Sequence, residues 1–278
     1  MDSIAYPGNK APDFCKGNGG YHFFLPHLFR NCKKGLYPLF TNQKLMISCI
    51  VLCLDEAACI EQVLQDLHKQ EYGQPYELLL ADGGSTDGTQ ELARPYARIV
   101  NCERGKARQM NQAAAEAKGD ILFFVHADMH LSPSTFSAIH ACIYEHGYDG
   151  GGFANEFDTH NQKIKQLGTL MNLRLLDKRE QSDKGIFYGD NGIFVRRTVF
   201  EQLGGFREIP IMEDYDFSLR MKQHFRVLRI ASPKIVVSAR RHIKAGFVKT
   251  RLQWVLIRKL YQWGVSPAFL AKWYRDIR

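Results

Sequence analysis

Two groups of ionisable residues are the clearest chemical signal in the sequence. His126 and Asp128 directly follow the apolar run 121–125, which is typical of a buried parallel strand, whereas Glu213 and Asp214 follow a Gly-Gly-Phe turn. Ligands of open α/β sheets bind beyond the carboxyl ends of the strands, so we expect Asp128 at a binding edge. The second pair could supply a general base at the same place. Together the two groups indicate metal-assisted group transfer from a donor that carries phosphate.

Asp128 and His126 are the candidate metal ligands. A carboxylate oxygen combined with the phosphates of a substrate suits Mg²⁺ or Mn²⁺, because these ions rarely need a complete protein cage. His126 lies two residues from Asp128, so both side chains can face the same side of an extended segment, and an imidazole ligand would favour Mn²⁺. The alternative for His126 is a packed or capping histidine, which makes it the weaker candidate.

Basic side chains at the start of a predicted helix form a candidate phosphate site. Lys106, Arg108 and Asn111 lie in the first turns of this helix, directly after a short predicted strand. Positive side chains beside a helix N-terminus favour the binding of a pyrophosphate. Arg240 and Arg241 follow the last predicted strand, where they could clamp a leaving diphosphate or simply begin a basic face.

The loop 82–89 is a candidate site for a nucleobase. It has the sequence Asp-Gly-Gly-Ser-Thr-Asp-Gly-Thr and directly follows a predicted strand. Its glycines allow tight turns and the close approach of a ligand, and Asp82 could accept a hydrogen bond from a ring N–H. The dinucleotide fingerprint G-x-G-x-x-G cannot be placed on this loop. The alternative is a polar loop in which Thr86 or Asp87 caps the next helix.

The elements that would position these residues alternate between strands and helices. In the first half we expect strands over 46–54, 76–81, 98–101 and 120–125, with helices over 56–70, 90–96 and 106–118. This alternation predicts βαβ units and a parallel sheet. In the second half we expect strands over 150–157, 186–195, 226–230 and 235–238, and helices over 133–145, 163–176, 213–224, 244–263 and 267–275. The second half should therefore be mixed α/β and complete the same sheet.

Positive charge is concentrated at the two ends of the chain. Residues 1–44 carry six Lys and Arg against two acids, and residues 240–278 carry ten against one, although the whole chain has a net charge of only +8. Basic ends beside a mildly acidic body argue against nucleic-acid binding and favour contact with phosphate or anionic lipid. Apolar residues recur at three- and four-residue steps over 247–263, which suits packing on the domain or association with an anionic membrane surface.

Cysteine use and hydropathy favour a reducing cytoplasm. The seven cysteines form no metal-binding pair, and Cys49 and Cys53 are expected to be buried free thiols. No run reaches the roughly 18 apolar residues of a membrane-spanning helix. The apolar run 45–54 does not match a signal peptide, because Asp55 and Glu56 follow at once without a small-residue cleavage site. We expect a cytoplasmic protein, with peripheral association at the inner face of the membrane as the alternative.

In combination, these motifs resemble family 2 glycosyltransferases of the GT-A fold. The resemblance runs from Met46 to about Tyr274, and within the family it is closest to the bacterial arsenosugar-biosynthesis-type subgroup. The motifs that carry it are Asp82–Thr89, Arg104–Asn111, His126–Asp128, Gly189–Asn191, Gly204–Phe206, Met212–Asp214 and Ser238–Arg241. The resemblance implies a Rossmann-like, mostly parallel mixed sheet flanked by helices, a nucleotide-diphosphate-sugar donor, a Mn²⁺ or Mg²⁺ ion, and inversion at the anomeric carbon.

The resemblance also implies roles for single residues. Asp82 would bind the nucleobase, Arg108 the base or the phosphates, and Asp128 the metal ion. Asp214 would deprotonate the acceptor hydroxyl, with Glu213 as an acceptor contact or as its orienting neighbour.

Two positions depart from the family pattern. The first strand usually ends in Asn-Glu, but Asp55 precedes Glu56 here, so recognition of the base or ribose is expected to differ. His126 stands where the Asp-x-Asp-type motif has its first acid, so a metal ion is expected to bind through a single carboxylate.

The sequence thus predicts an inverting, metal-dependent glycosyltransferase in three parts. Residues 1–44 would form a flexible extension, 45–239 the catalytic domain, and 240–278 basic amphipathic helices on the domain or the membrane. The acceptor would be a small molecule or a lipid. A nucleotidyltransferase is the nearest enzymatic alternative, although Asp55 and Glu56 occupy the place of its Gly-rich basic loop. A non-catalytic membrane-surface protein of the same fold would bind no nucleotide diphosphate.

Overall fold

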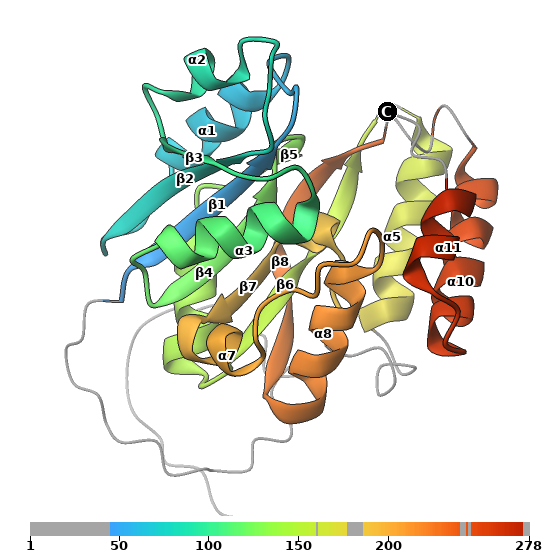
Figure 1. The fold of residues 1–278 in the computed structure, drawn as a ribbon. Helices are drawn as coiled ribbons and strands as arrows, with labels where there is room; N and C mark the ends of the chain where they lie inside the picture. Colours follow the sequence, from blue (N-terminus) through green and yellow to red (C-terminus); the bar gives the residue numbers. More distant parts are fainter. Residues whose placement is uncertain (1–44, 160, 177–185, 240–242, 244–245, 275–278) are drawn as a thin grey trace, which may run out of the picture. The chain divides into compact units, whose positions relative to one another are not determined.

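A mixed eight-stranded sheet forms the centre of the described part of the protein (Figure 1). The computed structural model describes residues 45–159, 161–176, 186–239, 243 and 246–274, all within one compact unit, Phe40–Arg278. The strand order is β3-β2-β1-β4-β7-β6-β8-β5. The strands are β1 Ile47–Cys53, β2 Tyr76–Asp82, β3 Arg98–Asn101, β4 Ile121–His126, β5 Met129–His130, β6 Gly150–Asp158, β7 Ile193–Arg196 and β8 Val227–Ser238.

Helices connect these strands in the alternating order that the sequence predicts. They are α1 Ile60–His68, α2 Thr89–Ala93, α3 Lys106–Glu116, α4 Thr135–His140 with its π-helical continuation η1 Ala141–Glu145, α5 Gln162–Leu176, the 3₁₀ turn η2 Gly189–Asn191, α7 Arg197–Gln202, α8 Glu213–His224, α10 Phe247–Gln262 and α11 Pro267–Trp273.

The first four strands are parallel, so their carboxyl ends meet at one edge of the sheet. The register pairs Cys53 at the end of β1 with Asp82 at the end of β2, and Leu52 of β1 with His126 at the end of β4. On the other side of β4, β7 runs antiparallel, and β6 and β8 then run parallel to each other. The loops that follow β1, β2 and β4 therefore leave from the same edge.

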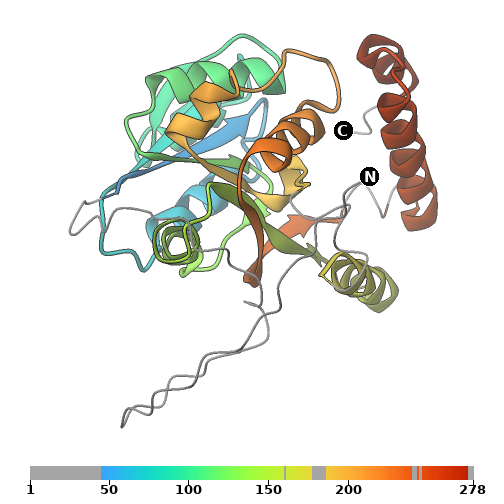
Figure 2. The same cartoon turned by 90° about the horizontal axis from the view of Figure 1, so that it is seen from below.

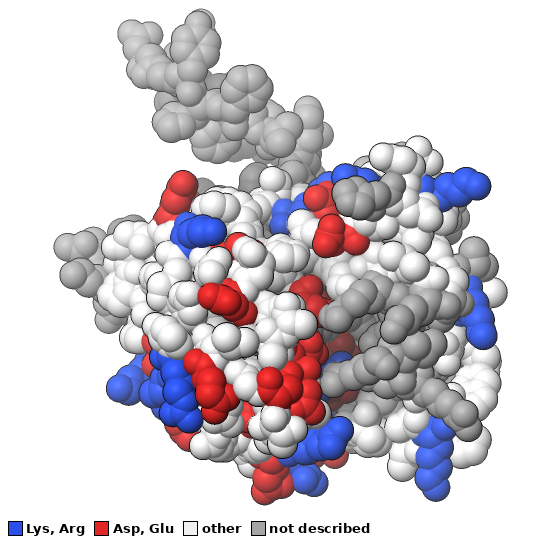
Figure 3. Space-filling model, turned by 90° about the horizontal axis from the view of Figure 1, so that it is seen from above, with Lys and Arg blue, Asp and Glu red and all other residues white. Residues whose placement is uncertain are grey.

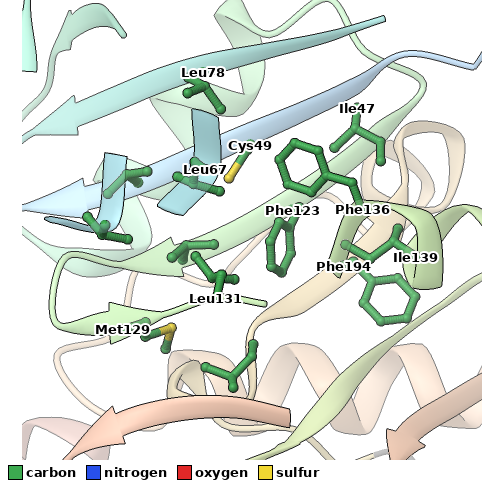
Figure 4. Close-up of a cluster of buried hydrophobic side chains, with 14 of the residues drawn as sticks. Ile47, Cys49, Leu67, Leu78, Phe123, Met129, Leu131, Phe136, Ile139 and Phe194 are labelled. Carbon is green, nitrogen blue, oxygen red and sulfur yellow. The ribbon is translucent and has the colours of Figure 1, made fainter. Parts of the chain in front are cut away.

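Helices cover both faces of the sheet (Figure 2). Side chains alternate between the faces along a strand, so Cys49 and Val51 of β1 join the hydrophobic cluster under α1 and α4, whereas Ile50 joins the cluster under α3, α7 and α8. Figure 4 shows the first cluster, in which Phe123 of β4 packs against Phe136 of α4 with ring centroids 6.1 Å apart. Strands buried on both faces explain the continuous apolar runs in the sequence.

The fold class predicted from the sequence is confirmed, whereas two element predictions are wrong. Residues 186–195 were expected to form one strand, but only 193–196 pair in the sheet, because the side chain of Asn191 accepts a hydrogen bond from the N–H of Tyr188 (3.0 Å) and closes a turn there. Conversely, 227–238 is one strand instead of two, with a register shift opposite Phe153 and Asn155. The short elements β5 and α7 were not expected.

Gln109 of α3 joins the ends of two central strands. Its side-chain amide donates hydrogen bonds to the carbonyl of Cys53 (2.7 Å) and to that of Ala81 (2.9 Å), and the residue is only 4% exposed. Gly83 packs against it, since a Cβ at residue 83 would lie 3.0 Å from the Gln109 amide. This contact holds α3 against the edge from which the loops leave.

Replacing Gln109 with Met removes both hydrogen-bond donors and keeps the length of the side chain. The Cys53 carbonyl keeps a second donor, the N–H of Gly83 (3.1 Å), so each lost hydrogen bond costs about 0.5–1.5 kcal/mol. We therefore expect the free energy of unfolding in urea to fall by about 1–3 kcal/mol. Gln62→Met is the control, because Gln62 is exposed on α1 and its amide donates to Asp66 of the same helix. It should change the stability by less than about 0.5 kcal/mol, and equal losses in both variants would contradict this role of Gln109.

Candidate active site

The acidic pair begins helix α8 and is tied to a distant turn. Asp214 accepts a hydrogen bond from the backbone N–H of Gly189 in η2 (2.7 Å to Oδ2) and from the N–H of Tyr215 (2.6 Å to Oδ1). Met212, directly before the helix, has a left-handed backbone with φ 71°. A non-glycine residue in this region costs about 1–3 kcal/mol, a strain that often occurs at functional sites. The direction of the Asp214 carboxylate is thus fixed by backbone donors.

His126 lies next to this acidic pair. A small cavity is lined by Leu52, Met110, Phe124, His126, Gly189, Ile193, Glu213 and Asp214. The imidazole lies against η2, because a Cβ added at Gly189 would collide with its Nε2 atom. The end of β4, the η2 turn and the start of α8 therefore meet at the carboxyl edge of the sheet.

Both carboxyl groups of the pair hold their protons more tightly than usual. Burial and the charge of Asp214 raise the pKa of Glu213 to about 7, against a lowering effect of Lys106. Burial also raises the pKa of Asp214, while the Gly189 N–H and Lys106 oppose the rise. Lys106, the first residue of α3, is thus close enough to act on both groups. A carboxyl group with a raised pKa is well suited to take a proton from a hydroxyl near neutral pH.

Asp82 is buried, and its own loop occupies its carboxylate. Donors to this carboxylate are the N–H groups of Gly84 (3.1 Å) and Ser85 (3.0 Å), the Ser85 hydroxyl, the Gln90 amide (2.7 Å) and the Cys53 thiol (3.3 Å). Burial raises its pKa, but the hydrogen bonds, those of Ser85 first, hold the pKa below the usual value. The residue is 1% exposed. Asp82 therefore shapes the loop 82–89, and its contact with a nucleobase stays a prediction.

The loops after β1 and β2 are joined to each other. The Asp55 carboxylate accepts a hydrogen bond from the N–H of Thr86 (2.9 Å), and the N–H of Glu56 donates to the Thr89 hydroxyl (2.9 Å). Glu56 thus stands beside the loop 82–89 at the edge where a nucleotide is expected. Its role in donor binding stays a prediction as well.

Arg108 and Asn111 of α3 both contact other parts of the protein. Arg108 forms ion pairs with Glu103 (2.9 Å) and Glu208 (3.1 Å), all of them exposed. The Asn111 side chain donates to the carbonyl of Phe206 (2.8 Å) and accepts from its N–H (2.9 Å). Exposed ion pairs contribute little, so Arg108 can exchange its partners for phosphate at small cost. Asn111 instead holds the Gly-Gly-Phe turn against α3.

Asp128 lies in the turn between β4 and β5 and is partly exposed. Within the described segments, no group of three or more His, Cys, Asp and Glu side chains could hold a metal ion by itself. One carboxylate with substrate phosphates and water is nevertheless a sufficient ligand set for Mg²⁺ or Mn²⁺. Asp128 therefore fits a metal ion whose coordination a phosphate-bearing donor completes, and His126 remains the weaker candidate. Figure 3 shows Asp and Glu side chains gathered near the middle of the face seen from above in Figure 1.

The basic C-terminal segment reaches the site through residues that the sequence motifs did not single out. Arg240 and Arg241 lie outside the described residues. Arg251 of α10 has a pKa lowered by burial, against the raising effect of Asp190 and Tyr188 in and beside η2. The face of α10 that carries Arg251 therefore borders the η2 turn, whose backbone holds Asp214. The backbone of Gly189 was missed as a partner of Asp214, although the Gly-Asp-Asn sequence was part of the recognised pattern.

The chain is similar to known glycosyltransferases over more than half of its length. Residues 48–204 match a family model described as glycosyl transferase family 2. A PGL/p-HBAD biosynthesis glycosyltransferase of Mycobacterium bovis is 29% identical over 185 residues, which cover 63% of this chain and 69% of that protein. The family match includes Asp82 and Asp128 but ends before Glu213 and Asp214. The narrower resemblance to the arsenosugar-biosynthesis subgroup is not supported, since the name of this relative points to a different pathway.

Solved structures share the fold. The mannosyltransferase PcManGT from Pyrobaculum calidifontis, in complex with GDP-Man and Mn²⁺, has a TM-score of 0.57 and 22% identity over 70% of this chain and 57% of its own. S. aureus TarS in complex with UDP-GlcNAc has a TM-score of 0.56 and 19% identity over 70% of this chain and 58% of its own. The match thus spans little more than half the length of each of these two solved proteins.

The raised pKa of Glu213 makes the stability of the fold depend on pH. The pKa is about 7 in the folded protein against 4.5 for an ordinary Glu, so the folded state binds this proton more tightly than the unfolded state. The contribution to stability is therefore complete below about pH 4.5 and is lost as the pH rises towards 7. The loss amounts to about 3 kcal/mol.

Glu213→Gln removes this titration and keeps the shape of the side chain. We expect the stability of the variant relative to the wild type to increase by about 2–3 kcal/mol between pH 5 and pH 8, measured by urea unfolding at both pH values. Glu91→Gln, at an exposed position of α2, is the control for the same substitution at the surface. A difference between Glu213→Gln and the wild type that is equal at both pH values would contradict proton binding by Glu213.

Proposed function

The chain is a glycosyltransferase that belongs to glycosyl transferase family 2, and we propose that it transfers a sugar from a nucleotide diphosphate to an acceptor hydroxyl with inversion at the anomeric carbon. The observation that carries this proposal is the meeting of His126, Gly189 and the Glu213–Asp214 pair beside Lys106 at the carboxyl edge of the sheet. The two acids thus lie near the basic start of α3, which supports a site for a phosphate-bearing donor there. Family membership favours this activity over a nucleotidyltransferase.

Asp214 is the proposed base. Its carboxylate borders the cavity, and the two backbone N–H donors hold it in one orientation. It would take the proton of the acceptor hydroxyl while the hydroxyl oxygen bonds to the anomeric carbon, and the bond from that carbon to the diphosphate breaks on the opposite side. Glu213 is proposed to contact the acceptor or to orient Asp214. Burial raises the proton affinity of both groups, and the charge of Asp214 raises that of Glu213 further.

The donor is proposed to lie between the loop 82–89 and the start of α3. The loop and Glu56 would face the base and ribose, with Asp82 holding the loop in shape and contributing to base recognition. Lys106 and Arg108 would bind the phosphates, because the helix N-terminus and these cations attract the same negative charge. Asn111 would support this helix through its turn contact, and Arg240 and Arg241 would assist the leaving diphosphate.

The metal ion is proposed to be Mn²⁺ or Mg²⁺, with Asp128 as its protein ligand and His126 as a weaker one. When bound, such an ion supplies positive charge that stabilises the leaving diphosphate. Support comes from the fold neighbour from Pyrobaculum calidifontis, which was solved with GDP-Man and Mn²⁺. We also propose that the enzyme is cytoplasmic and that its acceptor is a small molecule or a lipid. The proposal includes peripheral association with the inner face of the membrane.

The donor can be identified by thermal shift with a panel of nucleotide-diphosphate sugars and Mn²⁺, and transfer or donor hydrolysis then measured with the best one. Asp214→Asn should lower kcat by about 100-fold or more, because the base is lost, while nucleoside-diphosphate binding in calorimetry changes little. Asp120→Asn is the matched control, since Asp120 lies at the opposite edge, where it accepts from the N–H of Met46. Near-normal turnover of Asp214→Asn would refute Asp214 as the base.

Asp128 should control the dependence on the metal ion. Asp128→Ala is expected to abolish Mn²⁺-dependent transfer and donor hydrolysis, because it removes the proposed carboxylate ligand. Nucleoside-diphosphate binding should no longer strengthen on addition of Mn²⁺ in calorimetry. His126→Asn should keep part of this strengthening, and full activity of Asp128→Ala would overturn the assignment.

A further inference from the structure

Helix α10 carries an exposed apolar stripe along one side. Lys249, Leu252, Leu256, Lys259 and Trp263 are all exposed and follow one another at three- and four-residue steps, from the first turn of the helix to the residue after it. Positions with this spacing share one face of a helix. Leu252 is 66% exposed, Leu256 43% and Trp263 75%. An apolar stripe of this length on the surface marks an interaction site more often than chance exposure.

The helix that follows adds to this surface. In α11, Phe269 is 62% exposed and Trp273 51% exposed, with the exposed Lys272 between them. Leu270 of the same helix is buried together with Ile257 of α10 and Tyr215 of α8 in one hydrophobic cluster. The two helices are thus packed on the domain through their inner sides while large apolar side chains remain outside.

The charge of this segment has one sign. Between Arg240 and Arg275 the sequence contains no Asp or Glu, whereas Lys249, Lys259 and Lys272 are exposed among the apolar side chains. An anionic lipid surface supplies negative charge and an apolar layer together, which is the combination that these lysines and large apolar side chains fit. Aromatic and apolar side chains with lysines at their margins are the composition of helices that lie in the interface of a bilayer. No described helix is both long enough and apolar enough to cross a bilayer.

We infer that the outer faces of α10 and α11 dock the enzyme on an anionic lipid surface. Leu252, Leu256 and Trp263 enter the interfacial layer, while Lys249 and Lys259 meet the headgroups. The docking itself does not depend on catalysis. Its use, to bring the site to an acceptor at the membrane, rests on the proposed glycosyl transfer.

The positions of the tryptophans make the docking measurable in the full-length protein. The chain contains three Trp residues, at 254, 263 and 273, so all of its tryptophan fluorescence arises from α10 and α11. Vesicles of phosphatidylcholine with phosphatidylglycerol should shift the emission to the blue and should sediment the protein. Pure phosphatidylcholine vesicles should bind at least about tenfold more weakly, and added salt should weaken the binding to the anionic vesicles.

Two matched pairs of variants separate this surface from the rest of the protein. Leu252→Gln with Leu256→Gln should weaken binding to anionic vesicles at least about tenfold, whereas Leu92→Gln with Leu167→Gln, at two exposed leucines elsewhere, should change it less than about threefold. Lys249→Glu with Lys259→Glu should also weaken it at least about tenfold, and Lys163→Glu with Lys165→Glu, exposed on α5, less than about threefold.

The outcomes are decisive in both directions. Absence of binding to anionic vesicles, or equal losses in the paired variants, overturns the inference. A stripe that instead meets a second copy would show an oligomer that Leu252→Gln with Leu256→Gln dissociates, without a change in vesicle binding. Donor hydrolysis in the absence of vesicles should stay unchanged in the leucine variants. Failure of the docking is therefore distinguishable from failure of the proposed transferase activity.

Discussion

The site depends on one hydrogen bond, from the backbone N–H of Gly189 to the carboxylate of Asp214. Its origin lies in the topology of the sheet. Because β7 runs antiparallel to β4, with Ile193 opposite Phe124, the residues directly before β7 must lie beside the end of β4. The η2 turn consequently falls next to His126, and α8 starts where it can reach that turn. A side chain at residue 189 would collide with the imidazole, so glycine is required for the approach.

The three acids in the first turn of α8 have three different environments. Asp216 forms ion pairs with Arg207 (2.8 Å) and Arg220 (2.7 Å), so its charge is satisfied. Asp214 accepts hydrogen bonds from two backbone N–H groups, and Glu213 is buried beside it. Burial raises the pKa of both Asp214 and Glu213. This difference is the physical reason why Asp214 is a candidate base and Asp216 is a structural residue.

Burying such a pair lowers stability, and aromatic packing behind it offsets the loss. Phe206 and Phe217 pack with ring centroids 4.3 Å apart, and Phe200 adjoins both at 5.8 Å and 5.6 Å. Phe206 also carries the backbone groups that Asn111 holds. Large apolar groups of this kind contribute both buried area and favourable ring contacts. The start of α8 is therefore supported from α3 and α7 as well as from η2.

The sequence predicts the elements of this site better than their contacts. Strands β1 and β4 are recognisable because burial on both faces produces continuous apolar runs, and α8 was predicted with its observed bounds. The use of Asp82 by its own loop and the bridge formed by Gln109 could not be predicted, because their partners come from other strands and helices. The 3₁₀ turn was mistaken for part of a strand, because it is closed by the side chain of Asn191, a contact that the pattern of apolar residues does not reveal.

Helix α10 connects the outer surface of the domain to the helix that carries the acids. On its inner side, the Tyr261 hydroxyl donates to Asp216 (3.1 Å) and the Gln262 amide donates to the hydroxyl of Tyr215 (2.6 Å). Tyr215 and Asp216 directly follow Asp214 in the first turn of α8. A contact that fixes the position of α10 would therefore also fix the first turn of α8, which carries Glu213 and Asp214. The apolar stripe and the acidic pair therefore lie on two helices that pack against each other, α10 and α8.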